Sequence, residues 1–444
     1  MSIKKKSGIR ITSAQIVVLG FLGLILLGAL LLMLPIASKE RVVTPFLDTM
    51  FTATSAVCVT GLIVKDTATY WSAFGQGIIL FLIQIGGLGV VMMAVLFTTL
   101  AGKSVSLSVR GMMQDTVTAP RIDGIVKITG FIFKGTLLVE LAGALLMMPV
   151  MITKFGARGI WMSIFHSISA FCNAGFDLMG TPESKFQSLT SFASDPYMNV
   201  VIMLLIVIGG IGFLTWEDVV KHKFHFRKYR LQSKVILVTS GVLILLPAIW
   251  FFFTEYNELG MKDRVLLSLF QSVTTRTAGF NTGDYAAMSG KGIAISVFLM
   301  LIGGSPGSTA GGLKTTTVAV LVANIVAVFK RRENPRMFGR RIDDSAIKSA
   351  ATLVMMYTLI FLVAAMFISA IEGISMSDCM FETASAIGTV GLTVGITPTL
   401  GTVSHVILMC MMFFGRVGIL TMVYAAVKPK QEVSKLPLEK IAVG

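Results

Sequence analysis

The chain has 444 residues, of which 54% are hydrophobic and only 14% charged, and its formal net charge at pH 7 is +15. About a quarter of the residues in soluble domains are charged, so this composition leaves no room for a sizeable soluble domain. Four widely spaced cysteines, at positions 58, 172, 379 and 410, match no zinc or redox spacing and are interpreted as small buried hydrophobic residues.

Eight apolar runs are long enough to cross a bilayer, which takes about 20 helical residues. In chain order they cover residues 14–35, 74–101, 126–153, 198–220, 234–254, 292–329, 349–370 and 403–427. The first run is too long for a signal peptide, and no small-residue cleavage site follows it. The sequence therefore predicts an all-α integral membrane protein with eight transmembrane helices.

Lysine and arginine residues set the predicted orientation. If the amino terminus is cytoplasmic, 25 of these cations lie in cytoplasmic segments and 10 in external loops. This bias follows the positive-inside rule and predicts a multi-pass protein of the cell membrane with both termini in the cytoplasm. The positive net charge is therefore explained without a nucleic-acid partner, because most of the cations flank membrane spans.

The four external loops share one plan. Each begins with a short amphipathic run, at 45–56, 160–171, 264–274 and 377–386. About 12 residues are too few to cross the bilayer, so each run is predicted to be a re-entrant half-helix. A glycine-containing stretch follows each run, with key glycines at 61, 175, 279 and 391, spaced by 114, 104 and 112 residues. This recurrence predicts four helix–pore loop–helix repeats around one pore.

The predicted repeats cover residues 1–102, 103–220, 221–341 and 342–428, and a cytoplasmic tail covers 429–444. The third repeat is predicted to have a broken second helix.

The glycine stretches have the properties of an ion-selectivity filter. Non-helical backbone is tolerated at membrane depth only where protein buries it or it lines a cavity. Four such loops would form rings of carbonyl oxygens that replace an ion's hydration shell, and the carboxyl ends of the half-helices favour a cation. Four ordinary glycine turns are the alternative. The predicted filter residues are Thr60, Gly61, Asn173, Ala174, Gly175, Thr277, Ala278, Gly279, Thr389, Val390 and Gly391.

The sixth apolar run is interrupted at residues 303–314, which contain five glycines and a proline. Such a segment cannot stay in a regular helix, so a break at membrane depth is predicted. A kink that serves only packing is the alternative. A phosphate-binding loop is excluded, because Walker spacing and a preceding strand are both missing.

Polar residues inside the apolar runs are candidate functional residues. Arg416 lies in the middle of the eighth run, where a charge is costly and indicates a function by default. Backbone carbonyls or hydroxyls of the broken segment are its predicted partners, and an arginine that merely ties two helices together is the alternative. Glu140 is either a proton or ion site or a buried glutamate paired with Lys134 or a hydroxyl. His166 and His405 lack metal-ligand spacing and are predicted to be structural.

Seven short motifs carry a family resemblance: Thr-Gly-Leu (60–62), Gln-Ile-Gly-Gly-Leu-Gly (84–89), Phe-Cys-Asn-Ala-Gly-Phe (171–176), Gly-Gly-Ile-Gly-Phe (209–213), Thr-Arg-Thr-Ala-Gly-Phe (275–280), Gly-Thr-Val-Gly-Leu (388–392) and Phe-Gly-Arg-Val-Gly (414–418). Through them the whole chain resembles the membrane subunit of Ktr/Trk potassium transporters, specifically the bacterial Ktr type. The resemblance implies one pore per chain and a homodimer with two pores. Glycine in all four loops, Gly61 included, implies that potassium is the transported ion and the ligand of the filter, with no organic cofactor.

The resemblance also implies a gate and a regulatory partner. The family's segment that matches 303–314 is an intramembrane loop that obstructs the pore below the filter, and an arginine contacts it. A separate cytosolic nucleotide-binding ring is implied, with the basic loops 221–234 and 330–348 as its docking surface and anionic membrane lipid as a competitor. The implied gate residues are Gly303, Gly304, Ser305, Gly307, Ser308, Thr309, Gly311, Gly312, Lys314 and Arg416.

Two other function classes were weighed against a potassium-conducting pore. A secondary carrier coupled to sodium or protons would also contain broken helices, but its repeats would alternate in orientation, whereas all four predicted loops face outside. A membrane-embedded enzyme would need paired acids or a Ser–His pair at one depth, and the sequence shows neither. Rubidium flux without a chemical product distinguishes these classes.

Overall fold

The computed structural model describes residues 12–101, 104–117, 124–427, 437 and 439. Within these residues the chain is helical, as predicted, except for loops and one small hairpin, in which β1 (Arg336–Met337) pairs with β2 (Arg340–Arg341). The hairpin was not predicted. The predicted cytoplasmic tail, apart from residues 437 and 439, lies outside the described residues.

Four described helices are long and apolar enough to cross a membrane in one piece. They are α1 (Ser13–Leu32), α6 (Ile125–Phe155), α10 (Leu231–Thr254) and α14 (Asp344–Glu372). Each packs against a shorter helix that follows it in the chain: α2 (Phe46–Cys58), α7 (Arg158–Phe171), α11 (Met261–Thr274) and α15 (Met376–Gly388). These short helices occupy the positions predicted for half-helices, and no boundary differs by more than three residues.

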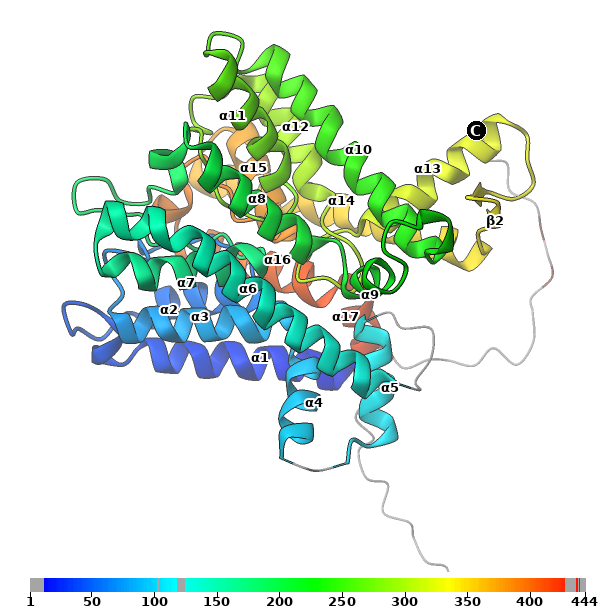
Figure 1. Ribbon diagram of the computed structural model, residues 1–444, viewed down its shortest axis with the longest axis horizontal. Helices are drawn as coiled ribbons and strands as arrows, with labels where there is room; N and C mark the ends of the chain where they lie inside the picture. Colours follow the sequence, from blue (N-terminus) through cyan, green and yellow to red (C-terminus); the bar gives the residue numbers. More distant parts are fainter. Residues whose placement is uncertain (1–11, 102–103, 118–123, 428–436, 438, 440–444) are drawn as a thin grey trace, which may run out of the picture.

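Three predicted spans are bent rather than continuous, which corrects the expectation for 74–101, 198–220 and 403–427. The bends join α3 (Ala73–Leu88) to α4 (Val90–Leu100) at 96°, α8 (Pro196–Gly210) to α9 (Phe213–His222) at 101°, and α16 (Thr402–Val417) to α17 (Ile419–Ala426) at 93°. The junction residues Gly89, Gly212 and Gly418 have φ angles of 91°, 90° and 88°, a region that glycine enters without steric cost. Figure 1 shows α4 turning sharply away from α3.

The predicted span over 292–329 is interrupted over a longer stretch of chain than the three bent spans. It consists of α12 (Gly290–Leu301) and α13 (Thr315–Phe329), two apolar helices that are each shorter than a membrane span. The residues between them are non-helical, and a parallel bridge pairs Ile302 with Leu313 at their two ends. The break therefore falls where the glycine-rich composition placed it. We call residues 303–314 the broken segment.

The remaining helices are short connectors. They are α5 (Leu107–Val117), which was not predicted, and the 3₁₀ turns η1 (Pro35–Ala37), η2 (Leu189–Phe192), η3 (Phe226–Lys228) and η4 (Thr397–Thr399).

The short helices are arranged in a closed ring. The helix after each one packs against the next short helix along the chain: α3 against α7, α8 against α11, α12 against α15, and α16 against α2. The last contact closes the ring on the first short helix. Each short helix has at least one completely buried phenylalanine in this core, among them Phe51, Phe171, Phe270 and Phe381. The carboxyl ends of the four helices, and the loops that follow, are thereby directed toward one central region.

Candidate ion pathway

Each short helix ends in a loop that has two left-handed residues separated by one other residue. The second is always glycine, with φ between 68° and 94° at positions 61, 175, 279 and 391. The first is a residue with a side chain, namely Val59, Asn173, Thr277 and Thr389, with φ between 51° and 68°. Residues with a side chain rarely adopt left-handed backbone angles. Such a residue at the same position in all four loops therefore indicates that the loops share one specific backbone conformation. Val59 was missed from the sequence, although its position two residues before Gly61 could have identified it.

The four loops contact one another in a ring. Each glycine faces the carbonyl of the residue before the next glycine, closely enough that a side chain would collide with it. The pairs are Gly61 with Ala174, Gly175 with Ala278, Gly279 with Val390 and Gly391 with Thr60, where a Cβ on the glycine would lie 2.5, 2.9, 2.3 and 2.0 Å from the carbonyl oxygen. The fourth pair closes the ring. The predicted filter residues are therefore brought together from four distant parts of the chain.

Hydroxyl groups of the short helices support these loops from behind. Ser55 and Ser385 accept the amide hydrogens of Gly61 and Gly391, both at 3.0 Å. The hydroxyls of Thr60 and Thr389 are also buried, but they have no hydrogen-bond partner within the described part of the chain. Unpaired buried hydroxyls are costly unless a ligand or water meets them, so their position in the ring fits a bound cation.

The two buried histidines fasten the outer ends of these loops. His166 on α7 bonds the Met162 carbonyl through Nδ1 at 2.7 Å, and its Nε2 accepts the amide hydrogen of Leu178 at 3.3 Å. His405 on α16 lies 2.9 Å from the Thr397 carbonyl through Nε2. Among the described residues no group of three or more His, Cys, Asp or Glu side chains could hold a metal. These contacts fit the structural role predicted for both histidines.

A second anchor holds the fourth loop. The buried carboxylate of Glu382 on α15 accepts hydrogen bonds from the hydroxyls of Thr393 and Thr397 and from the amide of Val394 at 3.1 Å. Three donors to one carboxylate fix the chain immediately after Gly391. No sequence signal indicates this role, because Glu382 lies within an ordinary amphipathic pattern.

A cavity of about 280 Å³ opens on one side of the ring and is lined by all four glycines of the ring. Two acidic side chains, Asp177 and Asp284, line the same cavity. Carboxylates at the mouth of a narrow path raise the local concentration of cations. We call this cavity the outer vestibule, because the loops that line it are those predicted from the sequence to face outside. Neither acid was singled out from the sequence, since each lies in a polar loop with no distinguishing pattern.

The broken segment lies against the opposite side of the ring. A Cβ on Gly311 would lie 2.2 Å from the hydroxyl oxygen of Thr389. The Thr309 hydroxyl donates to the Phe171 carbonyl at 3.1 Å, and the Gly312 amide donates to the Gly415 carbonyl at 3.1 Å. The segment therefore spans from the end of α7 to α16, against the loops of the ring.

Two cations fasten the broken segment. Arg416 on α16 donates to the carbonyl of Thr309 and to the carbonyls of Gly86 and Gly87 at the end of α3, the last at 2.8 Å. Lys314 donates to two carbonyls of its own segment, those of Ala310 at 2.7 Å and Gly311 at 3.3 Å. Neither cation forms an ion pair with another described residue. Arg416 thus connects three elements, whereas Lys314 stabilises the segment internally.

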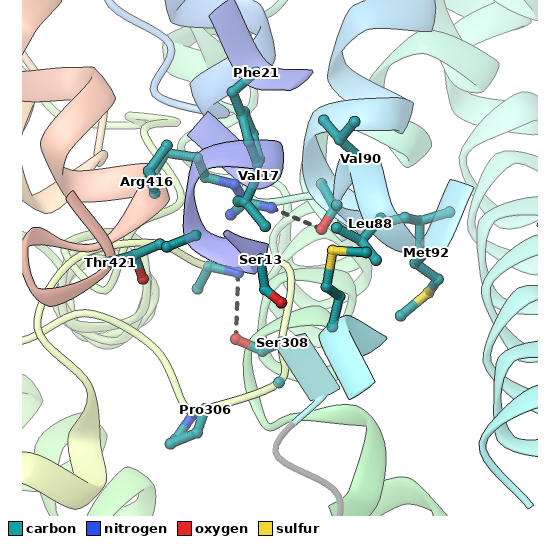
Figure 2. A pocket seen from close by; sticks show the side chains of 18 of the residues that line it. Ser13, Val17, Phe21, Leu88, Val90, Met92, Pro306, Ser308, Arg416 and Thr421 are labelled. Atoms are coloured by element: carbon teal, nitrogen blue, oxygen red, sulfur yellow. Dashed lines mark hydrogen bonds between the residues drawn. The ribbon is translucent and has the colours of Figure 1, made fainter. Parts of the chain in front are cut away.

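Both cations line a cavity of about 600 Å³ on this inner side. Figure 2 shows the guanidinium of Arg416 reaching toward the backbone beside Leu88, with Val17 of α1 nearby and Pro306 and Ser308 on the broken segment below. A path from the outer vestibule through the ring would therefore meet the broken segment and two positive charges before it reached this cavity.

Known proteins match this chain over almost its whole length. The TrkH family, described as "Cation transport protein", matches residues 10–436. The chain belongs to the TrkH family of cation transport proteins. It is 40% identical to the potassium/sodium uptake protein NtpJ of Enterococcus hirae, over 100% of this chain and 99% of the relative. It is 36% identical to the Ktr system potassium uptake protein B of Bacillus subtilis, over 98% of both chains.

A solved structure shows the same fold as this TrkH-family protein. The potassium transporter TrkH from Vibrio parahaemolyticus superposes with a TM-score of 0.72, at 21% sequence identity, over 95% of this chain and 86% of that one. The resemblance to Ktr/Trk transporters stated from the motifs is therefore confirmed, and the chain is a multi-pass membrane transporter rather than an enzyme.

The outer vestibule of this TrkH-family protein provides a test by pH. Burial raises the pKa of Asp177, in the loop after α7, to about 7, and the negative charge of Asp66 adds to the rise. A carboxyl with a raised pKa is neutral below that value, so its attraction for cations is lost as pH falls through 7. At subsaturating substrate we expect cation uptake to fall roughly two- to threefold between external pH of about 8 and about 6.

The variant Asp177→Asn should remove this pH dependence and hold uptake at the low value, whereas Asp284→Asn should leave the pH dependence in place. Initial uptake rates into vesicles at fixed internal pH measure the effect. An unchanged pH profile in Asp177→Asn would show that another group titrates.

Proposed function

We propose that the protein takes up potassium through the ring of carbonyls at Thr60, Ala174, Ala278 and Val390. The observation that carries the proposal is the closed ring itself, in which four loops present oxygen atoms around one centre with glycine at each point of closest approach. Carbonyl rings of this kind replace the hydration shell of an alkali cation. The names of the relatives, potassium/sodium uptake protein and Ktr system potassium uptake protein B, favour potassium as the cation.

The broken segment is proposed as the gate of this path. It lies directly beneath the ring and contacts Thr389. Arg416 ties it to α3 and α16, and the positive charges of Arg416 and Lys314 oppose the passage of a cation. Opening would require the segment to move and these charges to leave the path.

A homodimer and a separate cytosolic nucleotide-binding ring are proposed as the assembly, with both termini of the membrane subunit in the cytoplasm. One contact supports a single docking surface made from the two basic loops. The rings of Phe226 in loop 221–234 and Phe338 in loop 330–348 meet with their centroids 6.1 Å apart. Light scattering of the purified protein should give about twice 47.8 kDa, and a stable monomer would contradict the dimer.

Flux into liposomes tests the function. Vesicles loaded with potassium and containing the purified chain should accumulate rubidium down the resulting electrical gradient, and competing potassium should reduce this uptake roughly tenfold more effectively than sodium. Empty vesicles are the control. Uptake that requires an imposed sodium or proton gradient would instead indicate a coupled carrier, and no uptake under either condition would contradict transport by this chain alone.

A further inference from the structure

A buried polar cluster lies behind the second filter loop and has no part in the pathway described above. Its centre is Glu140 in the middle of α6, which is 5% exposed. The Gln84 amide on α3 donates to the Glu140 carboxyl at 3.2 Å. The Cys172 thiol at the end of α7 lies 3.8 Å from the Gln84 amide oxygen and 4.0 Å from the carboxyl. The cluster thus joins three helices.

The carboxyl of Glu140 has no cationic partner among the described residues. Lys134, considered as a partner from the sequence, is exposed and forms no described ion pair. The Ser167 hydroxyl bonds the backbone carbonyl of Glu140 at 2.6 Å rather than its side chain. An unpaired charge buried at membrane depth is costly, whereas a neutral carboxyl bonded to an amide is not. The surroundings therefore suit Glu140 in its neutral form.

The position of the cluster connects the filter to the gate. Cys172 directly precedes the filter residues Asn173-Ala174-Gly175. A Cβ on Gly87 would lie 2.7 Å from the Cys172 sulfur, so the end of α3 packs directly on the start of this loop. The carbonyl of Gly87 accepts Arg416 from the other direction. Gln84 lies less than one turn before Gly87, so its bond to Glu140 fixes this end of α3.

The bend of α3 does not need Gln84. The residues five positions before the bend glycine in α8 and α16 are Val207 and Phe413, and those helices bend by 101° and 93°, against 96° for α3. The amide at Gln84 is therefore explained by its contact with Glu140 and Cys172, not by the local helix geometry.

The contact between the second and third loops is the loosest of the ring. A Cβ on Gly175 would lie 2.9 Å from the Ala278 carbonyl oxygen, against 2.0 to 2.5 Å at the other three glycines. The second loop therefore has more room to shift at this contact than at the one it makes with the first loop, and the cluster supports it from behind.

We propose that Glu140 and Gln84 are positioning residues that hold the second filter loop in place and so set the preference for potassium over sodium. Neither residue touches the ion, and the inference rests on the proposed potassium filter. A change in either residue lets the loop at 172–175 shift, which alters the spacing of the oxygen ring more for one ion than for the other.

The test compares three variants by rubidium and sodium uptake into liposomes. Glu140→Gln keeps the size and the hydrogen-bonding capacity of the neutral carboxyl, and it should stay within about twofold of the parent selectivity ratio. Glu140→Leu removes the hydrogen bond and Gln84→Val copies the residue found in α8, and each should lower the ratio about fivefold, as the loss of one hydrogen bond predicts. Rubidium uptake itself should persist, which a merely unstable variant would not show.

Glu258→Leu, which removes an exposed glutamate, is the matched control and should leave the ratio unchanged. If selectivity is unchanged in both Glu140→Leu and Gln84→Val, the proposal is wrong and the cluster serves only helix packing. A collapse of selectivity in Glu140→Gln would also overturn it, since the neutral form would then not be the working one. If the parent shows no selective uptake, the proposed filter fails instead. Gln84→Val, the milder change, decides the matter if Glu140→Leu does not fold.

Discussion

Replacing Gly391 with serine is expected to abolish most of the preference for potassium over sodium, with a loss of roughly tenfold or more in the flux ratio. Two physical causes act together at this position. The backbone has φ of 94°, which residues with a side chain rarely adopt, and the new Cβ would lie 2.0 Å from the Thr60 carbonyl oxygen. Because neither atom can move without displacing a loop, the ring must open between the first and fourth loops.

The other three glycines provide a graded series for the same measurement. The distance from the new Cβ to the facing oxygen increases from 2.3 Å at Gly279 to 2.5 Å at Gly61 and 2.9 Å at Gly175. The loss of selectivity on substitution by serine should decrease in that order. Parallel rubidium and sodium uptake into liposomes measures the ratio.

Gly395→Ser is the matched control for backbone strain. Its φ is 96°, close to that of Gly391, but a Cβ there would meet nothing within 4 Å. We expect it to retain selectivity. A similar loss of selectivity in Gly395→Ser would mean that backbone strain in the loop causes the effect. Equal losses of selectivity at all four ring positions would show that proximity to the carbonyl is not the cause.

Repetition made the ring predictable from sequence. The short helices and the glycines after them recur four times, and each copy strengthens the interpretation of the others. The broken segment was predictable for a different reason, because five glycines and a proline in twelve residues exclude a helix without reference to any partner. In both cases the information is local to a short stretch of chain.

The bends at Gly89, Gly212 and Gly418 were missed because the apolar runs continue through them. A single glycine is tolerated inside a helix at a cost of about 1 kcal/mol, so hydropathy alone reads each run as one span. Comparison of the repeats could have revealed the bends, since the three glycines end the same motif.

Contacts between distant residues were beyond the sequence for a more basic reason. The position of Arg416 in an apolar run shows that it needs partners, but not that Gly87, 329 residues away, is one of them. Likewise Gln84 and Glu140 are separated by 56 residues and lie on different helices. A polar side chain in an apolar run indicates that it has a hydrogen-bond partner in the fold. Which residue that partner is depends on how the helices pack.

Substituting Arg416 with alanine is expected to raise basal rubidium uptake by the membrane subunit alone, by roughly tenfold or more. Three carbonyls lose their charged donor, those of Thr309, Gly86 and Gly87. A hydrogen bond to a charged group contributes about 1.5–3 kcal/mol, and one such contribution is enough to shift a two-state gate by an order of magnitude. A chain shortened within the broken segment should leak in the same way.

Two further substitutions separate the possible causes. Lys314→Ala removes a positive charge from the same cavity but breaks bonds only within the segment, so its effect should be smaller than that of Arg416→Ala. Arg416→Lys keeps the positive charge but loses the planar guanidinium that reaches several carbonyls. If its uptake is close to that of Arg416→Ala, the effect comes from the lost hydrogen bonds. If its uptake equals that of the parent, the effect comes from the charge. Should Arg416→Ala and the shortened chain both leak no more than the parent, while keeping the parent's oligomeric state, the broken segment is a packing kink. The gate must then lie elsewhere along the path, because neither freeing the segment from Arg416 nor shortening it would have opened the pore.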